Sequence, residues 1–195
     1  MNRSVIILGG GGHATVLIET LMCCGVEIAG ICDPRIEKGA PGPLGICCLG
    51  GEEILSSNSI STTLLVNGLG STRSTEARRD LFLRFKRDGF RFASVVHPSA
   101  VIAKNVTFGE GVQIMAGCVL QPEVILGDNV IVNTGATVDH HCSIGSHSHV
   151  APGVTLSGNV QIGAGSHLGT GAVVVHSVQM GRNSFVRSGA IVVDQ

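Results

Sequence analysis

The chain has 195 residues, of which 44% are hydrophobic, and a formal net charge of −1. This length suffices for one large or two small domains. The near-neutral charge provides no cationic surface for nucleic acid or anionic membranes, and the absence of Trp and Tyr argues against stacking on bases. The seven cysteines are odd in number and form no CxxC pair, which favours reduced thiols. With no signal segment and no apolar run of bilayer length, we expect a cytoplasmic protein without membrane insertion.

The first half of the chain alternates strands with helices. Residues 5–8 form an apolar strand, and a glycine-rich loop and an apolar-periodic helix follow it. Further strands are expected at 27–32 and 63–67, a loop with a short strand at 34–51, and a charged helix at 75–88. Because strands that alternate with helices pair in parallel, residues 1–95 are predicted to form a small α/β domain.

The loop after the first strand indicates a nucleotide site. Gly9, Gly11 and Ala14 fit the pattern G-x-G-x-x-A between a strand and a helix, and Asp33 ends the second strand. Glycines let the backbone approach a phosphate, and a helix N-terminus favours an anion. The alternative is a tight strand-to-helix turn without a ligand.

The second half repeats every six residues. From Ile102 to Val192 every sixth residue is apolar, and four places after each stands a small or β-branched residue. This register is typical of a hexapeptide-repeat parallel β-helix, in which residues eighteen apart stack at about 4.8 Å. Cys118 and Cys142 occupy the small inward position, so we expect them to pack in the core.

Six of the eight histidines lie in the repeat, at positions other than the two inward ones, so core packing does not explain them. These are His140, His141, His147, His149, His167 and His176. The register stacks His149 on His167, and His140 on Gly158 and His176. Such a face suggests general-base chemistry or a zinc site, and solvated surface histidines are the third possibility.

Three segments resemble one family: GGGGHA, VVHPSAVIA and NTGATVDHHCSIGSHSHVAPGVTLSGNVQIG. They are similar to bacterial sugar acyltransferases, namely the N-acetyltransferases of bacillosamine, perosamine and viosamine pathways and the sialic-acid O-acetyltransferases. The resemblance implies a Rossmann-like half domain over 1–95 that binds a nucleotide sugar. It implies a left-handed β-helix over 96–195 that forms a homotrimer, binds acetyl-CoA between neighbouring subunits and needs no metal. It also implies a role in glycan biosynthesis.

The resemblance assigns roles to particular residues. His140 matches the catalytic base and His149 a histidine that contacts acetyl-CoA, while Thr170 and Ser188 fall where the coenzyme channel runs. The residues that match the nucleotide-sugar site are Gly11, Gly12, His13, Asp33, Pro34 and Gly70.

This sequence differs from the family pattern at two places, directly after the catalytic base and in one loop of the α/β domain. The family commonly has an acidic residue directly after the base, where this chain has His141, so Asp139 or His141 is expected to orient His140 instead. The loop NGLGSTRSTEARR is longer than its family counterpart, and sugar recognition is expected to differ there.

The predicted function is direct acetyl transfer from acetyl-CoA to the amine of a nucleotide-linked amino-deoxysugar, with His140 as general base. O-acetylation of a sialic-acid-type hydroxyl is an alternative on the same scaffold. A zinc enzyme of the γ-carbonic-anhydrase type and a non-catalytic nucleotide-sugar-binding protein are alternatives of other classes.

Overall fold

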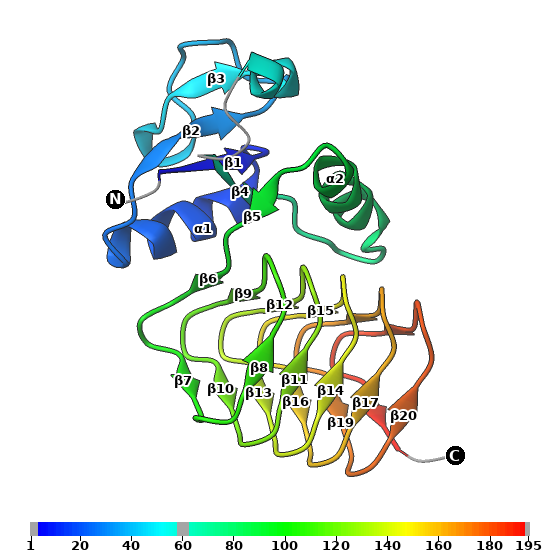
Figure 1. The fold of residues 1–195 in the computed structure, drawn as a ribbon. Helices are drawn as coiled ribbons and strands as arrows, with labels where there is room; N and C mark the ends of the chain where they lie inside the picture. The colour runs from blue at the N-terminus through cyan, green and yellow to red at the C-terminus, as the bar shows by residue number, and fades with distance from the viewer. Residues whose placement is uncertain (1–3, 58–62, 194–195) are drawn as a thin grey trace.

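A computed structural model describes residues 4–57 and 63–193, and it consists of a small α/β unit above a stack of triangular coils (Figure 1). The α/β unit holds one parallel sheet in the order β3-β2-β1-β4-β5. Its strands are β1 Val5–Leu8, β2 Ile28–Cys32, β3 Cys48–Gly50, β4 Leu64–Asn67 and β5 Arg91–Phe92. Its helices are α1 Gly12–Cys23, α2 Glu76–Arg87 and two short 3-10 segments, η1 Pro43–Gly45 and η2 Glu52–Ser57. Neither α-helix is long and apolar enough to cross a membrane in the part of the chain described.

Two hydrophobic cores lie on the two faces of this sheet. β1 is buried along its whole length, as its uninterrupted apolar run predicts. Helix α1 buries Leu17 and Leu21 in a core that continues into the coils, while α2 buries Leu81 and Phe82 on the other face. The predicted strands and helices are therefore present, and their ends differ by at most one residue from those expected. The two 3-10 segments were not predicted.

The coils form a left-handed parallel β-helix with three sheets. Each sheet is named after its outward-facing surface: the covered sheet, the apolar-faced sheet and the polar-faced sheet. The covered sheet contains β6 Val95–Val96, β9 Gln113–Ile114, β12 Ile131–Val132, β15 His149–Val150, β18 His167–Leu168 and β21 Phe185–Val186. The apolar-faced sheet contains β7 Val101–Ile102, β10 Val119–Leu120, β13 Thr137–Val138, β16 Thr155–Leu156, β19 Val173–Val174 and β22 Ile191–Val192. The polar-faced sheet contains β8 Thr107–Phe108, β11 Ile125–Leu126, β14 Ser143–Ile144, β17 Gln161–Ile162 and β20 Gln179–Met180.

The six-residue register is confirmed by the pairing of residues eighteen apart, such as His149 with His167. The second residue of each strand is buried on every strand from β9 to β19 and is half-buried on β6, β7, β20 and β22 at the two ends of the stack. Cys118 and Cys142 are fully buried as predicted. Phe108 departs from the pattern with 41% exposure. It lies on β8, the first strand of its sheet, where no preceding coil covers it.

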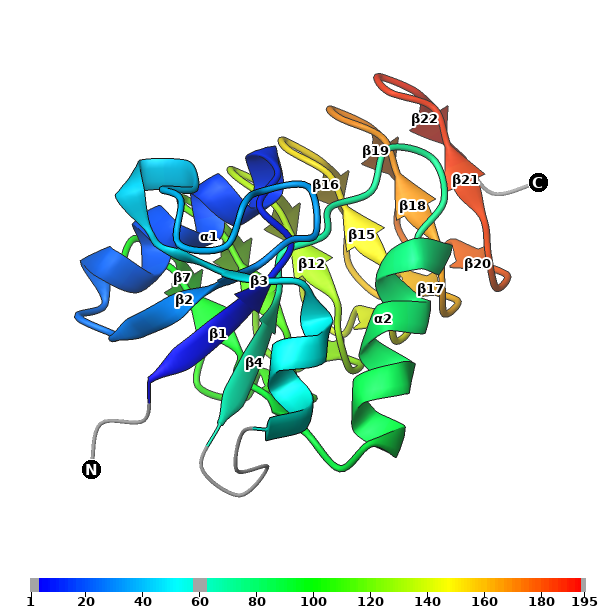
Figure 2. The same cartoon turned by 90° about the horizontal axis from the view of Figure 1, so that it is seen from above.

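The α/β unit rests on the covered sheet (Figure 2), and α2 runs beside this sheet from Thr75, which bonds Gly165 O before β18, to Lys86, which bonds Glu110 before β9. Outward side chains of this sheet are therefore buried although they lie outside the coil core: Gln113, Ile131, His149 and His167. The apolar-faced sheet carries a column of aliphatic residues and threonines, and none of the other described segments packs on it. Val101 is 62% and Ile191 is 69% exposed in this column. The edge between the covered and apolar-faced sheets is called the first edge below, and that between the apolar-faced and polar-faced sheets the second edge.

Candidate active site

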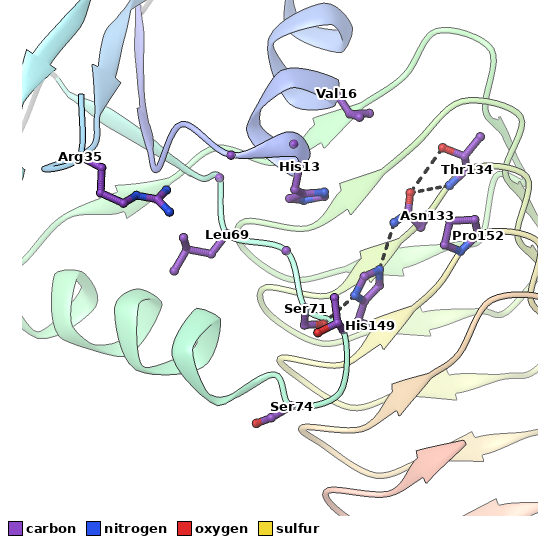
Figure 3. A pocket seen from close by; sticks show the side chains of 15 residues that line it. His13, Val16, Arg35, Leu69, Ser71, Ser74, Asn133, Thr134, His149 and Pro152 are labelled. Carbon is purple, nitrogen blue, oxygen red and sulfur yellow. Dashed lines mark hydrogen bonds between the residues drawn. The ribbon is translucent and has the colours of Figure 1, made fainter. Parts of the chain in front are cut away.

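An open cavity of about 670 Å³ lies between the α/β unit and the first edge of the β-helix (Figure 3). Both halves of the chain line it: Gly11, Gly12, His13, Val16, Arg35, Gly68, Leu69, Gly70, Ser71, Thr72, Ser74, Asn133, Thr134, His149 and Pro152. The predicted residues Gly11, Gly12, His13, Gly70 and His149 therefore meet in one site.

The glycine loop presents the N-terminus of α1 to this cavity. Gly11 is the N-cap residue, and it provides no side chain to bond the N–H groups of the first turn, which contains no acidic residue. A Cβ placed on Gly11 or Gly12 would meet no atom, because both face open space. Free N–H groups and the positive end of the helix dipole make this a site for an anionic ligand such as a phosphate.

Asp33 lies behind the glycine loop. Its Oδ2 accepts a hydrogen bond from Gly10 N–H at 2.8 Å, and the Arg35 guanidinium donates to both carboxylate oxygens. The hydrogen bond from Arg35 keeps the pKa of Asp33 far below its usual range. With Pro34, Asp33 lines a separate cavity of about 210 Å³ on the other side of the loop. Arg35 lines both cavities, and Asp33 holds the loop and Arg35 in place.

The His13 side chain is fixed by a buried glutamine of the β-helix. Gln113 Nε2 donates to Asn67 O at 2.8 Å, so its Oε1 is the acceptor that faces His13 Nε2 at 2.7 Å. His13 therefore carries its proton on Nε2. Burial, followed by the positive charge of Arg78, lowers the pKa of His13 to about 4, and the ring is neutral at pH 7.

His149 belongs to a chain of hydrogen bonds with a defined direction. Asn133 Oδ1 accepts from Thr134 N–H at 2.8 Å, so Asn133 Nδ2 donates to His149 Nε2 at 3.1 Å (Figure 3). Since His149 Nε2 accepts, its Nδ1–H donates to Ser71 Oγ at 2.7 Å. The Ser71 hydroxyl in turn donates to His167 Nδ1 at 3.1 Å. Burial lowers the pKa of both histidines, so both are neutral.

Arg78 ties the loop after β4 to the β-helix. Its buried guanidinium donates to Leu69 O at 2.6 Å and Asn67 O at 3.3 Å, and to Asn129 Oδ1 at 2.8 Å. Its Nε is buried without a partner in the described structure. Burial lowers the pKa of Arg78 to about 9, which leaves it positively charged at pH 7. This cation and the Ser71 contacts fix the long loop against the covered sheet.

His140 lies elsewhere, exposed at the second edge. Its Nδ1 lies 2.9 Å from Nδ1 of His141, and its ring lies over Gly158 and 6.4 Å from that of His176, as the predicted column requires. Asp139 accepts a hydrogen bond from the backbone N–H of His140 at 2.7 Å. It is His141 and not Asp139 that contacts the His140 ring. The apolar-faced sheet separates this edge from the cavity of the same chain.

The first edge continues beyond the cavity to Thr170 and Ser188. Both occupy the place that Thr134 and Pro152 hold in earlier coils, after successive strands of the covered sheet. Ser188 lines a further open cavity of about 620 Å³ with Thr72, Arg73, Phe185 and Arg187. Thr170 is exposed between the two cavities along this edge.

Sequence reasoning missed several residues of the site: Ser71, Arg78, Gln113, Asn133 and the two arginines Arg73 and Arg187. Gln113 and Asn133 carried no distinctive signal, because polar residues at the outward positions of a repeat are equally expected on an exposed surface. Ser71 and Arg78 carried none, since only the packing of the two units buries them.

Comparisons with known proteins agree with this geometry. Residues 4–79 match the PglD N-terminal domain family, and residues 105–140 and 123–158 match the bacterial transferase hexapeptide family. The acetyltransferase domain of PglB from Neisseria gonorrhoeae is 32% identical, with a TM-score of 0.91 over 98% of this chain and 92% of that one. PerB from Caulobacter crescentus, solved with CoA and GDP-perosamine, is 36% identical, with a TM-score of 0.90 over 98% and 89%. The chain belongs to the hexapeptide-repeat sugar acyltransferase family. No curated protein matches it significantly.

Family membership makes the protein an acyltransferase. The PglB domain has also been solved in complex with acetyl coenzyme A, at 30% identity and a TM-score of 0.89 over 98% of this chain and 93% of that one. The cavity at the junction of the two units is thus the candidate active site of a sugar acyltransferase.

Proposed function

We propose that the protein transfers an acetyl group from acetyl-CoA to the amino group of a nucleotide-linked amino-deoxysugar. The observation that carries the proposal is the cavity itself, where an unblocked helix N-terminus faces an edge of the β-helix. PerB was solved in complex with CoA and GDP-perosamine, and these two ligands support the same pair of substrates here.

The nucleotide sugar is placed at the glycine loop. The N–H groups at Gly12 and His13 face the phosphates. Gly70 lines the opposite wall, where the absence of a side chain lets it lie close to His13. Behind the loop, Asp33 holds both Gly10 and Arg35, which adds a positive charge, and Pro34 lies beside Asp33.

Acetyl-CoA is placed along the first edge, with His149 near its thioester end. Arg73 and Arg187 give the second cavity two positive charges for the coenzyme phosphates, and Phe185 provides an aromatic face for the adenine. Thr170 and Ser188 line the path between the two cavities.

The active site is completed by a second copy in a homotrimer. The apolar-faced sheet is not covered by any described part of its own chain, and it carries Val101, Val119, Val173 and Ile191 in one column. If three copies turn this sheet toward a common axis, the first edge of each meets the second edge of the next. His140 of one subunit then faces the cavity of its neighbour.

His140 is the general base, and His141 takes the place of the family's acidic residue. With its proton on Nδ1, His140 donates to His141 Nδ1 at 2.9 Å and leaves Nε2 free to accept a proton. The sugar amine attacks the thioester carbonyl and Nε2 takes the proton that the amine loses. The C–S bond then breaks, and the coenzyme leaves as a thiolate that receives this proton from Nε2. No acyl-enzyme intermediate is required.

Release of the coenzyme thiol tests this function. UDP-, dTDP- and GDP-linked 4-amino sugars are supplied with acetyl-CoA, and N-acetylated product is expected with one of them. The His140→Ala variant is expected to lose about 100-fold or more in kcat while still binding acetyl-CoA. Near-normal turnover in this variant would exclude His140 as the base.

The same assay decides between the alternatives. Acetylation of a sugar hydroxyl in place of the amine would favour the O-acetyltransferase, and no thiol release with any nucleotide sugar would favour a binding protein. For the zinc enzyme, His140, His141 and His149 form no three-donor cluster within the described part of one chain. The cytoplasmic location also stays a proposal, in keeping with the seven free cysteines.

A further inference from the structure

We propose that Glu19, Cys23 and His97 form a binding site for a zinc-like divalent metal ion, away from the candidate active site. The three side chains bring one carboxylate, one thiol and one imidazole together, with donor atoms within 4.8 Å of one another. Glu19 and Cys23 are one turn apart on α1, and His97 follows β6 at the start of the first edge. The cluster therefore bridges the α/β unit and the β-helix.

The spacing of the donor atoms fits a tetrahedral ion. Ligand bonds of about 2.0–2.3 Å at tetrahedral angles place neighbouring donors about 3.3–3.7 Å apart. Cys23 Sγ lies 3.1 Å from Glu19 Oε1, and His97 Nε2 lies 3.8 Å from Glu19 Oε2. These distances run to the two oxygens of one carboxylate, and one donor atom of each residue lies within 4.8 Å of the other two. Side-chain rotations that move the donors by about one ångström bring all three to the ideal spacing. Glu19 and Cys23 are exposed and free to make them.

The donor set selects the kind of ion. A thiolate with an imidazole and a carboxylate suits Zn²⁺ or Co²⁺, whereas Mg²⁺ and Ca²⁺ prefer oxygen ligands alone. Three protein ligands leave a fourth position for water. In the free protein the Cys23 thiol donates to Glu19, which raises the pKa of the thiol, so binding releases this proton to solvent.

His97 has a partner that can hold its ring for metal binding. Its Nδ1 lies 2.8 Å from Ser99 Oγ and 3.1 Å from Ser99 N. When Nε2 binds the ion, the proton resides on Nδ1 and is donated to the Ser99 hydroxyl, while the bond from Ser99 N–H is given up. A histidine ligand that donates its other N–H in this way is the usual arrangement in metal sites.

Cobalt absorption tests the site on the full-length protein under reducing conditions. Titration with Co²⁺ is expected to produce a thiolate-to-cobalt charge-transfer band that saturates at one ion per chain, and Zn²⁺ is expected to abolish it. Cobalt held by imidazoles alone produces no such band. No band, or a band unaffected by Zn²⁺, would overturn the proposal.

Matched cysteine variants locate the site. Cys23→Ser is expected to remove the band and His97→Gln to weaken Co²⁺ binding at least about tenfold. Cys24→Ser is the control, because this neighbouring exposed thiol points to Val96 O at 3.3 Å and is no part of the cluster. A band that survives in Cys23→Ser, or that is lost in Cys24→Ser, would place the thiolate ligand elsewhere. Acetyl transfer enters neither readout, so the metal site and the proposed function fail independently.

Discussion

The histidines of this protein fall into two environments that suit different tasks. His149 and His167 are buried between the α/β unit and the β-helix, and burial keeps both rings neutral. His140 and His141 are exposed at the second edge, where one ring can orient the other. A buried histidine that has lost affinity for protons is suited to contact a ligand by hydrogen bonds. The exposed pair is suited to take up a proton.

The buried histidines make folding stability depend on pH. Because the pKa of His13 is about 4 in the folded chain and about 6.5 unfolded, the unfolded state binds the proton first as pH falls. Stability is therefore complete above about pH 7 and decreases between about pH 6.5 and 4, by up to about 1.4 kcal/mol per pH unit for each such group. Denaturant unfolding at fixed protein concentration measures this slope.

Replacement of one buried histidine should flatten that profile. His13→Gln is expected to recover about 2 kcal/mol of the stability lost between pH 7 and pH 4.5, relative to the unmodified protein. His176→Gln is the control, since His176 is exposed on a later coil. Equal slopes in all three proteins would contradict the prediction.

Arg78 supports the loop that forms one wall of the cavity. Arg78→Met removes the donors for Leu69 O and Asn129 Oδ1, and we expect a loss of about 2–4 kcal/mol in unfolding free energy. The control is Arg79→Met on the same helix. Arg79 pairs with its neighbour Asp80 at the surface, and its loss should cost less than about 1 kcal/mol. Similar losses of unfolding free energy in the two variants would show that the buried contacts of Arg78 contribute no more to stability than a surface ion pair.

At the scale of elements, the six-residue register decides which side chains the β-helix buries. Each coil alone leaves its apolar residues open above and below, so stacking provides the burial. The loop after β4 follows no such register. It is held by Ser71 against His149 and His167, and by Thr75, whose hydroxyl donates to Gly165 O at 2.9 Å. The long loop thereby becomes a fixed wall of the cavity.

Two neighbouring residues of β17 test the register. Ile162 points inward and is 4% exposed, whereas Gln161 points outward from the same strand. Ile162→Asp is expected to cost about 4 kcal/mol or more, because it removes apolar burial and places a carboxylate in the core. Gln161→Asp should change stability by less than about 1 kcal/mol. Thermal unfolding of the two variants compares them, and equal effects would refute the inward assignment.

At the scale of the whole molecule, the chain separates the two halves of its proposed active site. The cavity lies at the first edge and His140 at the second, with the apolar-faced sheet between them. A site within one chain would leave His140 without a substrate, whereas a trimer brings the two edges of neighbouring chains together.

Mixed oligomers test whether subunits share the site. Gly11→Phe fills the cavity without a clash at the backbone, since Gly11 has φ −85° and its Cβ direction is open. Homotrimers of this variant and of His140→Ala should both be inactive. When the two are co-expressed in equal amounts, about a quarter of the sites combine an intact cavity with an intact His140. Activity near that fraction is expected, and continued inactivity in mixed trimers of confirmed mass would place the whole site in one chain.

The sequence by itself determined the β-helix, the α/β unit and the glycine loop, because these follow from short periods and local backbone geometry. It also stacked His149 on His167 and placed Cys118 and Cys142 in the core. Only the tertiary structure decided which outward residues are buried, since that depends on where the α/β unit rests. In the tertiary structure Asp33 lies behind the glycine loop and not in the main cavity, Ser71 bonds both His149 and His167, and His140 lies at a separate edge. These contacts join residues up to about a hundred positions apart, for which no local pattern in the sequence provides a signal.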